Sequence, residues 1–176
     1  MKTIIEIRPK DDLLNFLLLA AIPKNKANKT EIFKHLHIED NTGVCCDGNR
    51  MHVVKNINDL GYVYEFKPGL YSIEKNTKNL IQLSPVTTDE VYPNWRRIIP
   101  DHAGKDEFTW ETYHGADCSG AVCTLIRKFP EFTILNIDHL KDICNLKVDW
   151  KCCWYGVTEI IKFVWENITV ITSPYG

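Results

Sequence analysis

Residues 3–20 read TIIEIRPKDDLLNFLLLA, and this opening stretch sets the architecture that we expect. The β-branched run at residues 3–7 predicts a short strand. Asp11 is a suitable N-cap for the helix that follows, in which Asn15 is the only polar interruption of a broad apolar surface. Pro23 ends this helix. A helix this apolar must pack against a large surface, so the chain is expected to begin with a strand followed by a buried helix.

Antiparallel strands are expected after this helix, because the next segments alternate apolar and polar residues. Turn-forming residues separate several of them, with Asn41 and Gly43 at one position and Pro68 and Gly69 at another. The expected strands lie at residues 31–38, 44–54, 62–66, 71–74 and 80–83. The first part of the chain thus predicts a strand, a helix and then antiparallel strands.

The same order of elements recurs toward the other end of the chain. A strand is expected first, then a short helix capped by Asp138, then three strands, at residues 132–136, 138–146, 148–154, 159–165 and 168–172. The intervening region is rich in proline and polar residues, apart from helical spacing at its end. We therefore expect one α+β domain over residues 1–176, made of two strand-helix-antiparallel-strands units at about 1–83 and 132–176, with an irregular insertion at about 84–131.

The composition is that of an ordinary soluble protein. The chain has 21 Lys+Arg against 23 Asp+Glu, a net charge of −2, so it cannot hold nucleic acid by bulk positive charge. Seven cysteines without a preceding signal-peptide pattern are typical of reduced thiols, and we expect a cytoplasmic location. The longest apolar run, residues 13–22, is about half of the roughly 20 residues that a membrane-spanning helix needs, so no membrane contact is expected.

Several segments are similar to the bacterial β sliding clamp of DNA polymerase III. Residues 44–51, VCCDGNRM, resemble its Thr-Asp-Gly-His-Arg-Leu strand and turn, and residues 92–100, YPNWRRIIP, resemble the Phe-Pro-Asp-Tyr-Arg-Arg-Val-Ile-Pro segment that ends its middle domain. Residues 134–140, ILNIDHL, are similar to the start of its second helix, and residues 168–175 to its terminal strand. These matches follow the order of the two units, and the resemblance implies a DNA-clamp-like fold of about one domain.

The resemblance also implies a non-enzymatic role as a sliding-clamp-like or clamp-derived binding protein, a processivity or replication-associated factor. The implied partners are duplex DNA bound through its backbone, a replication protein or polymerase, and further copies of the chain if it encircles DNA. Because phosphate contacts need basic side chains, we place them at Lys24, Lys26, Lys29, Arg96 and Arg97. The two predicted helices carry balanced charge, so a clamp-fold adaptor that binds protein and no DNA is an alternative.

A different chemistry is indicated by residues 117–120, DCSG, which resemble the nucleophile segment of papain-like cell-wall peptidases. A helix is expected next, and a helix N-terminus stabilises a thiolate such as that of Cys118. The nucleophile also needs a general base, and His139 is the only histidine that follows it. A cysteine hydrolase built on Cys118 and His139 is therefore a second alternative, and a capped helix with a buried thiol is the simpler interpretation.

Metal and cofactor sites are not expected. The cysteine spacings do not form the two short pairs of a zinc site, and no glycine-rich phosphate loop occurs. His35 and His37 can share one face of a strand, but no third ligand lies nearby in the sequence. An exposed sheet face explains these two histidines.

Overall fold

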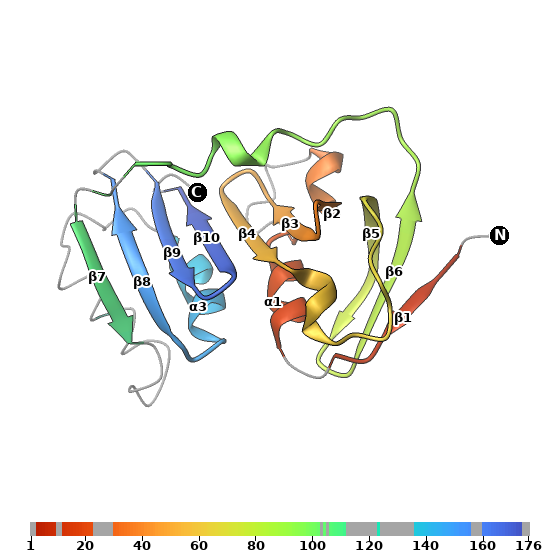
Figure 1. Cartoon of the computed structure of the whole chain (residues 1–176), viewed down its shortest axis with the longest axis horizontal. Helices are drawn as coiled ribbons and strands as arrows, with labels where there is room; N and C mark the ends of the chain where they lie inside the picture. Colours follow the sequence, from red (N-terminus) through yellow and green to blue (C-terminus); the bar gives the residue numbers. More distant parts are fainter. Residues whose placement is uncertain are drawn as a thin grey trace.

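The computed structural model describes residues 3–9, 12–22, 30–102, 104, 106–111, 123, 136–155 and 160–173. Within these residues ten strands form, namely β1 (Ile5–Ile7), β2 (His35–Glu39), β3 (Thr42–Cys46), β4 (Arg50–Lys55), β5 (Gly69–Thr77), β6 (Leu80–Val86), β7 (Asp106–Glu111), β8 (Asp149–Trp154), β9 (Ile161–Trp165) and β10 (Ile168–Thr172). They pair antiparallel in one sheet, in the order β1-β6-β5-β2-β3-β4-β10-β9-β8-β7 (Figure 1).

The sheet joins two parts of the chain at one strand pair, which we call the seam. There β4 pairs with β10, and Val170 lies opposite His52. Helices α1 (Leu13–Leu19) and α3 (Ile137–Cys144) contact each other on one face of the sheet, behind the strands in Figure 1. The fold class is the expected α+β arrangement of two strand-helix-strands units. The unit boundaries at about residues 83 and 132 stay a prediction.

Helix α1 is held by burial, because its sequence LLNFLLL contains no charged residue. It packs on β3, β4 and β5. Each fully buried leucine contributes about 1.5–3 kcal/mol, which compensates for a length too short to be stable alone. Gly43 on β3 permits the close approach, since a Cβ there would lie 2.7 Å from side-chain atoms of Leu17 and Ile57. The helix begins after Asp12 rather than after the expected Asp11, which lies outside the described residues.

A second, smaller core lies on the other face of the central strands, which we call the outer face. After β6, residues 87–102 form a linker that crosses from one part of the sheet to the other (Figure 1). Tyr92 and Trp95 of this linker pack against a cluster of outward-pointing strand residues that includes Val44, Met51 and Ile171. The linker is therefore part of the folded structure and covers apolar strand residues.

Three expected strands differ from the observed ones. Residues 44–54, expected as one strand, are divided by the turn at Asp47 and Gly48 into β3 and β4, which pair with each other. Residues 62–66 do not form a strand, because the Asn58 side chain takes both backbone groups of Phe66, accepting from its N–H (2.7 Å) and donating to its carbonyl (3.1 Å). The hairpin is instead formed by β5 and β6. The expected strand at residues 31–38 begins as a 3₁₀ helix, Glu31–Lys34, and becomes a strand at His35.

The region expected to be an irregular insertion contains an edge strand, β7, that pairs with β8 along its whole length. Phe108 and Trp110 pack toward the helix side, and Glu107 on the other face pairs with Lys151, so the segment has the period of a half-buried strand. In α3 the N-cap is Asn136, whose side chain accepts from the N–H of Asp138, rather than Asp138 itself. The expected strand at 132–136 and helix at 121–129 lie almost entirely outside the described residues.

Candidate binding site at the seam

The turn between β3 and β4 is built by Asp47 and Gly48, in the string that resembles the strand and turn of the clamp. One oxygen of the Asp47 carboxylate accepts from the backbone N–H groups of Asn49 and Arg50, each at 2.9 Å. Gly48 has a φ of 91°, which glycine adopts without strain. The carbonyl of Asn49 accepts from the N–H of Ser173 (2.8 Å), so the turn is attached to the end of β10.

Arg50 forms a buried ionic cluster behind this turn. Its Nε donates to Asp47 (3.0 Å), its Nη1 to Asp142 of α3, and its Nη2 to the carbonyl of Ile22 (2.8 Å) and to that of Leu19. No part of the Arg50 side chain is exposed. One guanidinium therefore connects β4, the C-terminal side of α1 and the helix of the other part of the sheet.

Two histidines extend the cluster. His139 of α3 is buried, with its Nδ1 3.3 Å from the hydroxyl of Thr172 and its Nε2 3.9 Å from the Asp47 carboxylate. His52 of β4 donates from Nδ1 to the carbonyl of Phe16 (2.8 Å) and stacks on the Phe16 ring at 4.3 Å. Burial lowers the pKa of His52 to about 3, and the nearby Arg50 contributes to this lowering, so this imidazole is neutral at physiological pH.

On the outer face, the same turn borders a small apolar pocket, which we call the outer groove. Its volume is about 90 Å³, and its apolar walls are Met51, Ile98, Ile160 and Ile171. Cys46 also lines it, and burial raises the pKa of this thiol to about 11, so the thiol is uncharged. The wall formed by Arg50 offers no free cation, because its guanidinium already binds the acceptors named above.

The expected phosphate-contacting arginines lie side by side in the linker but in different settings. Arg96 binds the carboxylates of Glu39 (2.5 Å) and Asp40 (2.8 Å), and its guanidinium lies 4.4 Å from the Trp95 ring centre. The Arg96 guanidinium lowers the pKa of the Glu39 carboxyl. Arg97 is exposed, has no ion pair within the described residues, and precedes Ile98 of the outer groove.

The other expected site residues are divided between the seam and segments that are not described. Lys24, Lys26, Lys29 and Cys118 lie outside the described residues. His139 lies in α3, as expected, with 2% of its surface exposed. The hydrolase pairing of Cys118 with His139 stays a prediction, as do the phosphate contacts.

The described residues contain no candidate metal site, because no three of their histidine, cysteine or acidic side chains lie close enough together to hold an ion. His37 instead stacks on Tyr92 at 4.5 Å and lies 3.6 Å from the Glu39 carboxylate. Among the helices of the described part of the chain, none has the length and hydropathy to cross a membrane.

Sequence reasoning missed the ionic cluster and the outer groove. A signal for the cluster was present, because Asp142 lies one helical turn after His139 and thus on the same face of the predicted helix. An aspartate on a buried helix face needs a basic partner, and Arg50 in the clamp-like string was available. The groove residues come from a turn, the linker and two later strands, and no local pattern connects them.

Comparison with known proteins identifies the fold. No family model matches the sequence, and no curated protein matches it either. Solved structures do match: the DNA polymerase III β subunit of Thermotoga maritima has a TM-score of 0.56 at 11% identity over 98% of this chain. The Borrelia burgdorferi β subunit, in complex with a natural product, has a TM-score of 0.57 at 13% identity over 99% of this chain. The Helicobacter pylori β clamp, bound to a DNA ligase peptide, has a TM-score of 0.55 at 8% identity over 100% of this chain. The chain spans 65%, 64% and 66% of their respective lengths. The resemblance seen in the sequence is confirmed at the level of structure: this chain has the fold of the bacterial DNA sliding clamps.

Proposed function

We propose that this chain is a non-enzymatic, clamp-fold binding protein of DNA replication, and that it holds a short peptide segment of a partner protein in the outer groove. The observation that carries the proposal is the groove itself, an apolar pocket whose walls come from the turn, the linker and two strands across the seam. The clamp of Helicobacter pylori, which has this fold, was crystallised with a DNA ligase peptide. A peptide is therefore a ligand class that the fold accepts.

The size and chemistry of the groove favour one apolar side chain as the anchor. A volume of about 90 Å³ is below the roughly 300–1,000 Å³ of sites that enclose a small molecule. The walls are aliphatic or thioether side chains, while Asn49 and Ser173 supply polar groups beside them. An extended segment that inserts one aliphatic or aromatic residue, and hydrogen-bonds at the rim, matches this arrangement.

DNA contact is the second candidate function, and the helices give it little support. Helix α1 contains no basic residue, and Lys141 of α3 pairs with Asp138 at 3.2 Å. Arg96 is already neutralised by two carboxylates. In this candidate function, backbone contact to a duplex is assigned to Lys24, Lys26, Lys29 and Arg97, and encirclement would require several copies of the chain.

The peptide proposal is tested by selecting peptides from a random displayed library on the immobilised protein, and measuring each selected peptide by fluorescence anisotropy. Ile98→Glu places a charge in the groove and should weaken binding at least tenfold, because the carboxylate loses water without gaining a partner. Val91→Glu is the matched control, since Val91 lies on the same linker, is 88% exposed and does not line the groove. Selection of no peptide, or equal binding by both variants, would contradict the proposal.

The DNA candidate is tested separately, by measuring the affinity for a short duplex as a function of salt. Replacing Lys24, Lys26 and Lys29 together with alanine should weaken binding and reduce the slope of log affinity against log salt by about one unit for each phosphate that the protein no longer neutralises. Lys75→Ala, on exposed β5, is the control. An unchanged slope removes these lysines from the site, and a strict monomer by light scattering, with and without DNA, removes the ring.

A further inference from the structure

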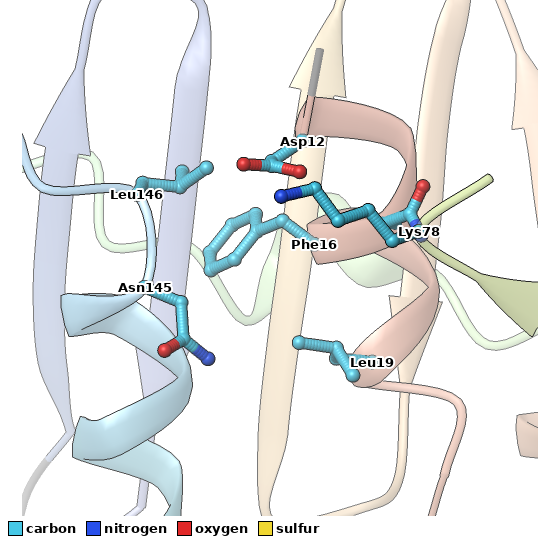
Figure 2. Close-up of a pocket in the computed structure, with 7 residues that line it drawn as sticks. Asp12, Phe16, Leu19, Lys78, Asn145 and Leu146 are labelled. Atoms are coloured by element: carbon cyan, nitrogen blue, oxygen red, sulfur yellow. The ribbon is translucent and has the colours of Figure 1, made fainter. Parts of the chain in front are cut away.

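A second pocket lies on the helix side of the seam, away from the outer groove, and we call it the helix-face cleft. Its volume is about 300 Å³. Asp12, Phe16 and Leu19 of the α1 region form one wall, Lys78 of the turn between β5 and β6 reaches over it, and Asn145 and Leu146 after α3 form the opposite wall (Figure 2). The cleft thus lies between the two parts of the sheet.

The floor of the cleft is apolar and fixed. The Phe16 ring is 2% exposed, stacks on His52 at 4.3 Å and lies 6.1 Å from the Trp150 ring. Stacking on His52 covers one face of the ring, and the side chain points from α1 toward the side of Asn145 and Leu146 (Figure 2). Leu19 and Leu146 are half-buried on either side. This floor suits an aliphatic group or a small ring better than a nucleobase, which needs an open aromatic face to stack on.

The mouth of the cleft carries one negative and one positive side chain. The carboxylate of Asp12 and the ammonium of Lys78 lie at the same end of the cleft, beside Phe16 (Figure 2). Both residues are exposed, and neither forms an ion pair with a described residue. The position of Lys78 is set by its neighbour Thr77, whose carbonyl accepts from the Asn15 side chain of α1 at 2.8 Å. Asp12 and Lys78 thus present opposite charges at one end of the cleft, which has an apolar floor.

We propose that the helix-face cleft binds a free α-amino acid with an apolar side chain. The α-ammonium binds Asp12, the α-carboxylate binds Lys78, and the side chain lies on Phe16 between Leu19 and Leu146. In an amino acid the two charges are separated by a single carbon, which suits a cleft that has Asp12 and Lys78 at the same end. A residue within a peptide carries neither charge, and a phosphate would be repelled by Asp12. This proposal is independent of the outer groove and of the DNA candidate.

The test is isothermal titration or saturation-transfer NMR with leucine at millimolar concentration. N-acetylleucine lacks the ammonium, leucinamide lacks the carboxylate, and glycine lacks the side chain. N-acetylleucine and leucinamide should each bind roughly fivefold more weakly than leucine or not at all, because an exposed charge pair contributes up to about fivefold in affinity. Glycine should also bind more weakly, because it has no apolar side chain to bury on Phe16. Equal binding of leucine and leucinamide would show that the cleft binds the apolar side chain without recognising the carboxylate, and would overturn the proposal.

Two variants locate the site. Asp12→Asn and Lys78→Gln should each weaken leucine binding by a similar factor, while the controls Asp59→Asn and Lys75→Gln, at positions outside the cleft, leave it unchanged. All four changes are on the surface, so the thermal melting curve can confirm that each variant folds. If leucine does not bind and Asp12→Asn and Lys78→Gln lower the melting temperature equally, the two side chains only pair with each other and the proposal is wrong.

Discussion

Arg50 and Arg96 each bind two carboxylates, but Arg50 lies in the seam with none of its side chain exposed, whereas Arg96 lies on the linker with 44% exposed. Water screens the charges of Arg96 and its two carboxylate partners, and it can solvate any one of these groups when a partner is removed. The seam cluster has no such replacement, so its charges depend on one another. The same pairing chemistry therefore connects the two parts of the sheet in one place and only attaches a surface segment in the other.

The largest effect is expected from Arg50→Met. The substitution leaves Asp47 and Asp142 buried without their cation and removes the donors to the carbonyls of Leu19 and Ile22. We expect the free energy of unfolding to fall by about 3–5 kcal/mol, measured by urea denaturation. Adding Asp142→Asn to this variant should recover part of the loss, because one uncompensated charge is removed. A loss below about 1 kcal/mol would place Arg50 with ordinary surface pairs.

An intermediate effect is expected from acid, through His52. The folded protein holds its pKa near 3, whereas the unfolded chain has the ordinary value of 6.5. As the pH falls below 6.5 the unfolded chain binds a proton that the folded protein does not, so stability is lost by about 1.4 kcal/mol per pH unit, or about 2 kcal/mol at pH 5.

The measurement is urea denaturation at several pH values, with the difference between wild type and His52→Gln isolating this histidine from the carboxylates. His37→Gln is the counterpart outside the seam, because His37 lies on β2 and stacks on Tyr92 of the linker. Burial also lowers the pKa of His37, but Glu39 beside it raises it again, so the pH dependence should change less. If the two variants change the dependence of unfolding free energy on pH equally, burial in the seam does not lower the pKa of His52 more than the surroundings of His37 lower its pKa.

The smallest effect is expected from Arg96→Ala. Its partners Glu39 and Asp40 are exposed and remain solvated, so the free energy of unfolding should fall by no more than about 1 kcal/mol, and by less at high salt. Chemical denaturation at low and high salt measures this. A large, salt-independent loss would show that the packing of Arg96 on the Trp95 ring, rather than its charge pairing, holds the linker.

Local patterns in the sequence were sufficient for the fold class. The apolar run of α1 is determined by nearby residues and was predicted. The Asp47–Gly48 turn was indicated only by the resemblance to the clamp string, because residues 44–54 as a whole were expected to form one strand. The strand expected at residues 62–66 was wrong because a side chain, Asn58, took the backbone groups that a partner strand would have used. β7 was missed because proline and polar residues on both sides of it concealed its alternation.

The candidate site depends on distant contacts that a single sequence does not reveal. Arg50 and Asp142 are 92 residues apart, and their pairing becomes evident only when α3 is placed beside α1. Ile98 and Ile160 approach the outer groove from the linker and from the start of β9. The resemblance to sliding clamps predicted the right architecture, but the identity of the groove and cleft residues required the three-dimensional arrangement.

The central position of β10 has a consequence for synthesis on the ribosome. β4 has β3 on one side and β10 on the other, and the side chain of Asn167, just before β10, donates to the carbonyl of Lys55, 112 residues earlier. Until residues 168–172 have been translated, one edge of β4 has no strand to pair with. Nascent chains that end between β4 and β10 should therefore expose the unpaired backbone edge of β4. We expect these chains to bind chaperones or to aggregate, while chains that extend past β10 do not.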